Sequence, residues 1–445
     1  MKEPPILIQK GLRQASLEGV QLIGHPSYID HKFAKDKWAI EVELSLILGS
    51  DKQVVPFPIF SRWFVVVDYD YPCGDIDIYP AKIGGIQETY HHQTLNCELI
   101  EDLPWRKGKI CLDKPIQSLG LIAGHPDPIG NYEERLMWHL QRALAWIHAA
   151  ATNTLVKLGD PFETPFYSYQ SDTRYVNDES AGSFAAWTGI KPGDWGFIIW
   201  DSLEGIDKTE FAIAYFKRNR ALIRATSKYN ECTHNLDNPK TTQGLWWLWP
   251  GPVVLNPWQA PVNWGELRRV GKTMGINVDY CLRGMNKVLQ GREPTLLYIG
   301  YPIPKRYGDG FSEIHWQAIV LPKMLPRAGG QKKPPRGFRS FERWQWWLES
   351  TSLFSNKEQL KYMETENWHP ERLQARGRLS QPLREAKIAL IGCGALGSIV
   401  AELLVRGGVA EILFIDPQLL EAGNLVRHTL SGQDIGEQKA VALAK

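Results

Sequence analysis

Length, composition and charge narrow the classes to which this chain can belong. Its 445 residues exceed one compact core and predict two or three domains, and 43% hydrophobic with 22% charged residues is typical of a globular protein. A formal net charge of only +2 argues against nucleic-acid binding, and no apolar run approaches the roughly 20 residues of a membrane span. Six cysteines without a C-x-x-C pair, and no signal peptide, predict a cytoplasmic protein with reduced thiols.

Residues 1–170 are predicted to form an α+β domain. Short β-rich runs, such as 38–48 and 62–68, alternate with turns. A helical stretch follows over 132–151, where apolar residues recur at a spacing of three or four and define one buried face. These apolar residues are Leu136, Leu140, Leu144 and Ile147.

Residues 171–340 predict a second α+β domain, in which we find neither a catalytic pattern nor an internal repeat. Turn signals alternate with apolar runs at 296–299 and 318–321. The stretch 326–337 is rich in Gly, Pro and cations, so we expect a linker or an exposed loop there. Two tryptophan clusters, which we expect to pack in a core rather than stack on a ligand, are Trp246, Trp247 and Trp249, and Trp344, Trp346 and Trp347.

Residues 341–445 contain a pattern that predicts nucleotide binding. A short strand at 387–391 leads into a G-x-G-x-x-G loop and then into a helical run at 398–406. The three glycines of the loop are Gly392, Gly394 and Gly397. They allow a tight turn and a close approach of the main chain to a phosphate, and the helix N-terminus adds N–H groups.

The residues after this loop indicate whether the bound nucleotide is NAD or a nucleoside triphosphate. A second strand at 411–415 ends in Asp416, whose carboxylate can accept hydrogen bonds from ribose hydroxyls. Up to this point an NAD-binding Rossmann domain fits equally well. Asn424, Arg427 and Lys439 then follow in N-L-V-R-H and D-I-G-E-Q-K-A motifs. An NAD site has no need of these cations, whereas an enzyme that expels pyrophosphate from a triphosphate does.

In this order and spacing, the motifs over 376–444 resemble the adenylation domain of the ubiquitin-activating and ThiF/MoeB superfamily. The resemblance implies a Rossmann-like α/β fold in which the glycine loop and Asp416 bind ATP, accompanied by Mg²⁺. The residues that it implies for the phosphates are Asn424, Arg427 and Lys439, with Arg427 and Lys439 as catalytic cations and Arg376 as a further contributor. His428 stands where the family usually has Gln.

The same resemblance implies features that these residues do not include. The metal-coordinating Asp and the thioester-forming cysteine of the activating domain lie further along in the family than Lys445. We therefore expect a longer natural protein and assign no metal ligand within this chain. The resemblance also implies a homodimer formed through the adenylation domain.

A second motif lies near the end of the first β-rich region. It reads G-K-I-C-L-D, with Cys111 as its cysteine, and a turn with His91 and His92 precedes it. This order resembles a ubiquitin-conjugating enzyme, and it implies that Cys111 carries a ubiquitin-like protein as a thioester. Conjugating enzymes have His-Pro-Asn closer to the cysteine, so here Asn96 or a histidine would support the oxyanion. The alternative is that Cys111 is core filling, as we expect of the other cysteines.

The combination resembles the fused activating–conjugating proteins of bacteria, including those of CBASS anti-phage operons. It implies that ATP activates the C-terminus of a ubiquitin-like or cGAS-like nucleotidyltransferase partner, which Cys111 then delivers to an amine. Lys107 and Lys109 beside this cysteine would favour its thiolate modestly. Two alternatives stay open, namely a sulfur-carrier adenylyltransferase of the thiamin or molybdopterin type and a non-catalytic binding scaffold.

Overall fold

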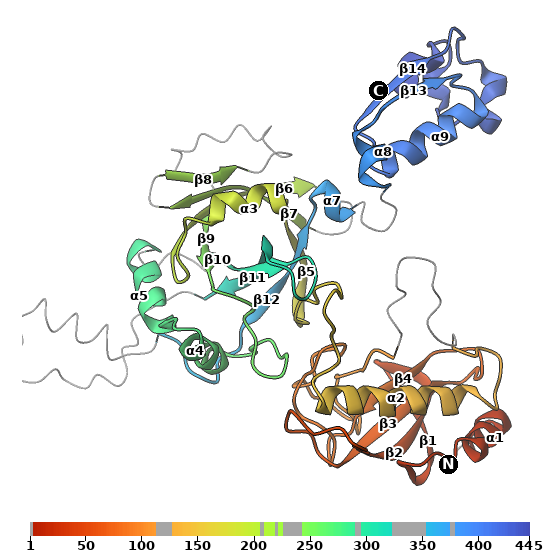
Figure 1. Cartoon of the computed structure of the whole chain (residues 1–445), viewed down its shortest axis with the longest axis vertical. Coiled ribbons are helices and arrows are strands. Elements are labelled where there is room, and N and C mark those ends of the chain that lie inside the picture. Colours follow the sequence, from red (N-terminus) through yellow and green to blue (C-terminus); the bar gives the residue numbers. More distant parts are fainter. Residues whose placement is uncertain are drawn as a thin grey trace, which may run out of the picture.

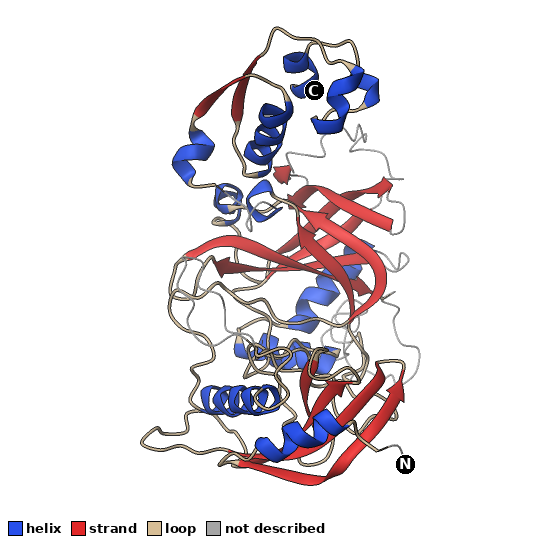
Figure 2. Ribbon diagram, turned by 90° about the vertical axis from the view of Figure 1, so that its right-hand side faces the viewer, coloured by secondary structure: helices blue, strands red, loops and turns tan. Residues whose placement is uncertain are grey.

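The computed structural model describes residues 3–112, 127–204, 209–218, 221–225, 243–289, 295–322, 353–373 and 379–445. They form three bodies in chain order: a sheet crossed by a helix, a curled sheet with helices, and a small α/β unit (Figure 1 and Figure 2). Outside the described residues lie Arg376, Cys232, the stretch 326–337 and the second tryptophan cluster. Within the described ranges, no helix has the length and apolarity needed to cross a membrane.

The first body contains an antiparallel sheet in the order β1-β2-β3-β4. Its strands are β1 (Val20–His31), β2 (Ala34–Ser45), β3 (Phe60–Asp68) and β4 (Ile76–Pro80). Alternate residues of β2, from Trp38 to Leu44, enter one core, as expected of a strand with a single face on that core.

Helix α2 (Arg135–Ala151) covers this face, with the short helix α1 (Ile6–Gln14) beside it (Figure 1). Its buried side includes Leu136, Leu140 and Ile147, so the spacing in the sequence predicts the buried face correctly. The helix begins three residues later than expected, because the side chain of Asn131 accepts the N–H groups of Glu133 and Glu134 in a preceding turn.

The second body is built on a sheet of eight strands that curls on itself. The order is β5-β12-β11-β10-β9-β6-β7-β8, and an additional pairing of β5 with β7 brings the two ends together. The strands are β5 (Tyr169–Asn177), β6 (Trp195–Glu204), β7 (Thr209–Arg218), β8 (Ala221–Ala225), β9 (Gln243–Leu248), β10 (Thr295–Pro304), β11 (Phe311–Leu321) and β12 (Lys361–Asn367). Because β12 pairs with β5 and β11, this body extends past residue 340.

Strand β9 separates the two cores of the second body. Trp247 belongs to the core beneath helices α4 (Trp264–Thr273) and α5 (Val278–Leu289), whereas Trp246 belongs to the core on the other face. Trp246, Trp247 and Trp249 are all 0% exposed, so this cluster packs in cores as expected. The short helices α3 (Ala181–Phe184) and η1 (Ala185–Trp187) lie on the side of Trp246.

The third body follows α7 (Pro370–Leu373) and lies apart from the first in Figure 1. Its two strands, β13 (Lys387–Ile391) and β14 (Glu411–Ile415), are parallel, and α9 (Ala395–Arg406) connects them. The remaining helices are α8 (Gln381–Glu385), η2 (Ala422–Arg427), η3 (Gly432–Asp434) and α10 (Lys439–Leu443). The strand–loop–helix–strand order predicted from the sequence is present.

Candidate functional site

The glycine loop between β13 and α9 needs its glycines. Gly392 has a φ of +91°, in the left-handed region that favours glycine. A Cβ on Gly397 would lie 1.9 Å from the carbonyl oxygen of Gly392, which no side chain could tolerate. No side chain caps α9 at Gly394, so the first N–H groups of this helix remain available as donors.

Asp416 lies beside this loop because the two strands are parallel and in register. Ile391 pairs with Ile415, so both carboxyl ends meet at one edge of the sheet. The Oδ2 atom of Asp416 accepts the N–H of Cys393 at 2.6 Å, and Oδ1 accepts that of Gln418 at 2.8 Å. Burial opposes ionisation, but these hydrogen bonds outweigh it and lower the pKa of Asp416. The carboxylate is therefore charged at the position expected for a ribose acceptor.

Lys439 and His428 complete this group of side chains. Lys439 is only 6% exposed, and its Nζ donates to Oε1 of Gln418 at 2.8 Å, near Asp416. The ring Nε2 of His428 lies 2.6 Å from the carbonyl oxygen of Cys393, within the glycine loop. The histidine that replaces the usual Gln is thus a contact of the loop, a role that the sequence analysis does not assign to it.

Asn424 and Arg427 lie on the neighbouring turn η2. The Oδ1 atom of Asn424 accepts the N–H of Glu421 at 3.1 Å, which caps the turn, and Arg427 is exposed. Among the described residues, no hydrogen bond joins either side chain to the glycine loop. The structure therefore groups the three glycines, Asp416 and Lys439, whereas Asn424 and Arg427 make no described hydrogen bond to this group.

The donors at this edge of the sheet suit a nucleotide. Main-chain N–H groups and the Lys439 ammonium can face phosphates, while the Asp416 carboxylate can face ribose hydroxyls. Within the part of the chain that the structure describes, no three His, Cys, Asp or Glu side chains group as metal ligands. The residues present thus fit the ribose and phosphates of ATP.

Cys111 opens into a cavity of about 790 Å³ between the first body and the segment 156–166. Residues 159–162 of this segment are hydrogen-bonded to residues 305–307 at the end of β10, so they belong structurally with the second body. The polar residues that line the cavity include Asp77, His92, Lys109, Cys111, Arg135 and Glu163. A cysteine exposed in a polar cavity is not core filling.

The main chain on both sides of Cys111 is held in place. The N–H of Cys111 donates to the carbonyl oxygen of His92 at 2.7 Å. The next carbonyl, that of Leu112, accepts two hydrogen bonds from the Arg142 guanidinium on α2, at 2.8 and 2.6 Å. The thiol therefore projects from a fixed stretch of backbone.

The two adjacent histidines have different surroundings. The ring of His91 stacks on Trp258 at 4.0 Å and meets the edge of Tyr307, both in the second body. Burial, followed by the neighbouring His92, lowers the pKa of His91 to about 4, so it is neutral at physiological pH. His92 instead faces the cavity and Glu163, with its Nδ1 3.4 Å from Oε2 of that carboxylate.

Two expectations for the surroundings of Cys111 need correction. Asn96 is fully buried, and its amide donates to the carbonyls of Ile86 and Glu88 at 2.9 Å, so it supports a loop and is not free for an oxyanion. Lys107 is paired with Glu98, and Lys109 lies 2.7 Å from Asp77. Both lysines are therefore largely compensated by carboxylates, which weakens their effect on the thiol.

The other described cysteines differ from Cys111 in their exposure and surroundings. Burial raises the pKa of Cys97 to about 12 and that of Cys281 to about 11. Burial also raises the pKa of Cys393, which is packed inside the glycine loop. Cys73 is exposed, so the expectation that it is core filling is wrong, but unlike Cys111 it does not line the cavity.

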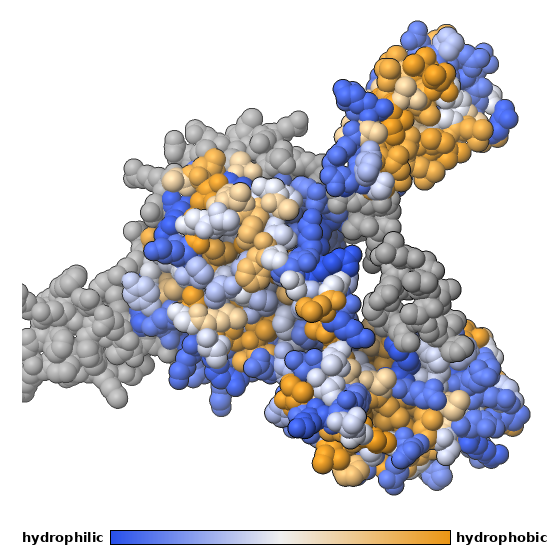
Figure 3. All heavy atoms as spheres, viewed as in Figure 1, coloured by the Kyte–Doolittle hydropathy of each residue, from blue (hydrophilic) through white to orange (hydrophobic). Residues whose placement is uncertain are grey.

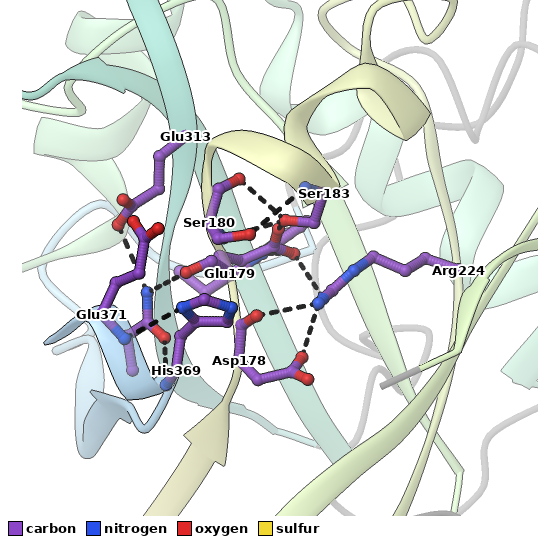
Figure 4. A network of polar contacts seen from close by, with 10 residues as sticks. Asp178, Glu179, Ser180, Ser183, Arg224, Glu313, His369 and Glu371 are labelled. Atoms are coloured by element: carbon purple, nitrogen blue, oxygen red, sulfur yellow. Dashed lines mark hydrogen bonds and ion pairs between the residues drawn. The ribbon is translucent and has the colours of Figure 1, made fainter. Parts of the chain in front are cut away.

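A second polar cluster lies within the curled sheet, around Glu179 (Figure 4). Glu179 is 0% exposed, and its carboxylate accepts the hydroxyl of Ser183, the Arg224 guanidinium at 3.0 Å and the Trp316 indole N–H at 3.0 Å. Burial raises the pKa of Glu179, while Arg224 acts against this shift. Since both carboxylate oxygens are paired with protein donors, we assign this cluster a structural role.

Comparisons with known proteins match two of the three bodies to families. The family described as Cap2 central linker domain matches residues 153–368, and the ThiF family matches residues 370–445. An ATP-dependent ubiquitin transferase-like protein Cap2 from Enterobacter hormaechei subsp. hoffmannii (strain UCI 50) is 31% identical over 420 residues, which is 93% of this chain and 67% of that protein.

Shorter matches fall on a smaller part of the chain. A protein of the same description from Escherichia coli (strain TW11681) is 41% identical over 70 residues, 15% of this chain and 12% of its own length. Sulfur carrier protein ThiS adenylyltransferase of Bacillus subtilis (strain 168) is 44% identical over 52 residues, 12% of this chain and 16% of its own.

The C-terminal fold and its nucleotide-type loop define the class of the protein as an adenylyltransferase of the ThiF type. The chain belongs to the Cap2 family of ATP-dependent ubiquitin transferase-like proteins. The resemblance to fused bacterial activating–conjugating proteins is thereby confirmed, and so is the expectation of an enzyme that combines adenylyltransferase and transferase chemistry.

Proposed function

We propose that the C-terminal unit binds ATP and adenylates the C-terminal carboxylate of a ubiquitin-like or cGAS-like nucleotidyltransferase partner. The glycine loop and Lys439 hold the phosphates, Asp416 holds the ribose, and Asn424 and Arg427 approach the phosphates from η2. ATP, with Mg²⁺, supplies the adenylate and the pyrophosphate leaving group, whose charge the cations of this edge stabilise. The contacts among Asp416, Cys393 and Gln418 support this assignment, because they hold the carboxylate ionised beside the loop.

The second part of the proposal assigns the acyl relay to Cys111. Its thiol receives the activated carboxyl group as a thioester and transfers it to a target amine. The four-stranded antiparallel sheet, the cysteine loop after β4 and the crossing helix α2 support a conjugating-type domain within the predicted range 1–170. The cavity adds further support, since it leaves space for an acyl group and an amine at Cys111.

A homodimer through the C-terminal unit belongs to the same proposal. Figure 3 shows an apolar surface on this unit. One face of α9 is exposed at a spacing of three to four residues, and its apolar members are Leu396, Ile399, Val400 and Leu403. Covering such a helix face favours association with a second copy. The biological setting we propose is anti-phage defence, by resemblance to CBASS proteins.

The single observation that carries the proposal is the alignment over 93% of this chain with an ATP-dependent ubiquitin transferase-like protein. The test uses the protein with ATP, Mg²⁺ and a cGAS-like nucleotidyltransferase, and follows Cys111 by intact-mass spectrometry. We expect an ATP-dependent adduct on Cys111 that thiol reductants cleave. A thiocarboxylated small carrier formed without any Cys111 adduct would instead support the sulfur-carrier alternative.

A further inference from the structure

Cys111 shares its cavity with an imidazole and a carboxylate that face each other. Nδ1 of His92 lies 3.4 Å from Oε2 of Glu163, and the two side chains are 36% and 27% exposed. Both residues line the same cavity as Cys111. The pair is therefore neither fully buried nor free in solvent, and it can be reached by a group that enters the cavity.

The backbone pairing places His92 opposite Cys111. Gln93 and Ile110 form an antiparallel bridge, and the N–H of Cys111 donates to the carbonyl of His92 at 2.7 Å. The main chains of the two residues therefore meet, and both side chains line the same cavity. Because Nδ1 of His92 faces Glu163, Nε2 is the ring nitrogen available for proton transfer at Cys111.

Glu163 also holds the main chain of His92. Its two carboxylate oxygens accept the His92 N–H at 2.9 and 3.1 Å. His92 has a φ of 56°, a left-handed conformation that a non-glycine residue adopts at a cost of about 1–3 kcal/mol and keeps only when its surroundings impose it. The carboxylate therefore fixes both the ring and the backbone of this histidine.

We propose that Cys111, His92 and Glu163 form a thiol–imidazole–carboxylate site shared by two bodies of the molecule. His92 is the catalytic proton carrier, and Glu163 is a positioning residue that orients its ring. This inference rests on the proposed role of Cys111 as acyl carrier. It assigns a direct part in transfer to the segment around Glu163, which belongs structurally with the second body.

The proposed step needs no additional reactant. The amine nitrogen attacks the thioester carbon, and Nε2 of His92 accepts a proton from it as the C–N bond forms. The C–S bond then breaks, and the imidazolium returns this proton to the leaving Cys111 thiolate. The products are an amide and a free thiol, and His92 ends in its starting state.

The other titratable groups near the pair do not replace it. Burial lowers the pKa of His91 to about 4, and its ring is stacked on Trp258. Tyr307 and Asp160 stand on the turns packed against Glu163, and burial raises the pKa of Tyr307 to about 12. Burial also raises the pKa of Glu163, although His92 counteracts this effect. Two further carboxylates of the cavity are paired, Asp77 with Lys109 and Asp127 with Arg135, while Asp75 is exposed at its edge.

The test uses small acyl and amine probes, so that it needs neither ATP nor a protein partner. The chain is acetylated with p-nitrophenyl acetate, and the acetyl group is mapped to Cys111 by mass spectrometry. Transfer of this acetyl group to n-butylamine is then timed as a function of pH in the wild type, His92→Asn, Glu163→Gln and Asp75→Asn. Asparagine is chosen at position 92 because it tolerates a left-handed backbone.

We expect His92→Asn to slow transfer by about 10²- to 10⁴-fold, the usual contribution of a general base, and to remove a titration from the pH profile. Glu163→Gln keeps an oxygen that can accept the His92 N–H but loses the charge, and we expect it to slow transfer at least about 10-fold. Asp75→Asn removes a carboxylate from the same cavity and should stay within about twofold, as expected of an unpaired surface charge.

Each outcome decides the inference. Wild-type transfer by His92→Asn, or no acetylation of Cys111, would overturn it, and wild-type transfer by Glu163→Gln would exclude the positioning role. Equal slowing by Asp75→Asn would show that only the total charge of the cavity matters, which also overturns the inference. If His92→Asn does not fold by circular dichroism, Glu163→Gln decides alone. If the acetyl group is transferred normally but ATP-dependent conjugation to a protein partner fails, the proposed function is contradicted and this inference is not.

Discussion

The cavity at Cys111 and the cluster around Glu179 contain similar groups in different surroundings. Each combines carboxylates with cations, and each joins residues far apart in the sequence. At Glu179 the carboxylate is 0% exposed, and both of its oxygens are paired with protein donors. At Glu163 the carboxylate and its partner His92 are 27% and 36% exposed, next to a thiol.

This difference separates a group that stabilises from a group that can react. A buried carboxylate with all its partners in place has no capacity left for a substrate, and losing one partner leaves the others uncompensated. A partly exposed pair beside a nucleophile keeps a nitrogen available and tolerates a change of charge. Substitutions in the two regions should therefore affect different properties.

The largest effect is expected at Cys111. Cys111→Ala should abolish conjugation while leaving ATP–pyrophosphate exchange unchanged, because the nucleotide unit does not use this thiol. Cys111→Ser should accumulate a more stable ester, since an alkoxide leaves less readily than a thiolate. Intact-mass spectrometry checks both variants, with Cys73→Ala as the control for an exposed cysteine of the same body. Conjugation that survives Cys111→Ala would leave the cavity without the proposed chemistry.

In the buried cluster, the expected effect is on stability. Glu179→Ala leaves the Trp316 indole N–H without its acceptor and leaves Arg224 with Asp178 as its remaining carboxylate. We expect a loss of about 1–3 kcal/mol in the free energy of unfolding, the cost of an unsatisfied buried donor. Urea unfolding followed by tryptophan fluorescence measures it. Arg269→Ala, which removes the exposed partner of Glu266 in the same body, should cost no more than about 0.5 kcal/mol. Equal losses in the two variants would remove the distinction between buried and exposed pairs.

Asp416 provides an intermediate case, since its carboxylate is held by main-chain N–H groups at an open edge. Asp416→Ala should weaken ATP binding by about 1–3 kcal/mol, the range for hydrogen bonds with a charged partner. Calorimetric titration of the protein with Mg²⁺ and ATP measures the change, and Glu402→Ala at the far end of α9 serves as the control. Tighter binding of NAD than of ATP would contradict the assignment of this site.

A separate effect on stability is expected from pH. Burial lowers the pKa values of His91 and His315 to about 4 from an ordinary 6.5. Between these values the unfolded chain binds more protons than the folded one, so the free energy of unfolding falls as the pH falls from 6.5 to 4. Urea midpoints measured at several pH values should show this loss, and His315→Gln should reduce it. A midpoint independent of pH in this window would show that neither ring is kept neutral by folding.

The local parts of this protein follow from its sequence. Glycine spacing, strand periodicity and the carboxylate at the end of β14 predict the nucleotide-type loop, because all these residues lie within one strand–helix–strand unit. The period of α2 likewise predicts its buried face. The motif around Cys111 predicts a candidate nucleophile without showing whether it is buried.

The tertiary structure alone decides how distant residues meet. Glu163 reaches His92 across 71 residues, and Trp316 reaches Glu179 across 137. Neither pairing leaves a periodic signal, because each is produced by the packing of one body or segment against another. The same packing distinguishes His91 from His92, which are adjacent in sequence, by stacking the first on Trp258 and turning the second toward the cavity. Burial and partner choice are properties of the folded chain, so the sequence determines the candidates and the fold selects among them.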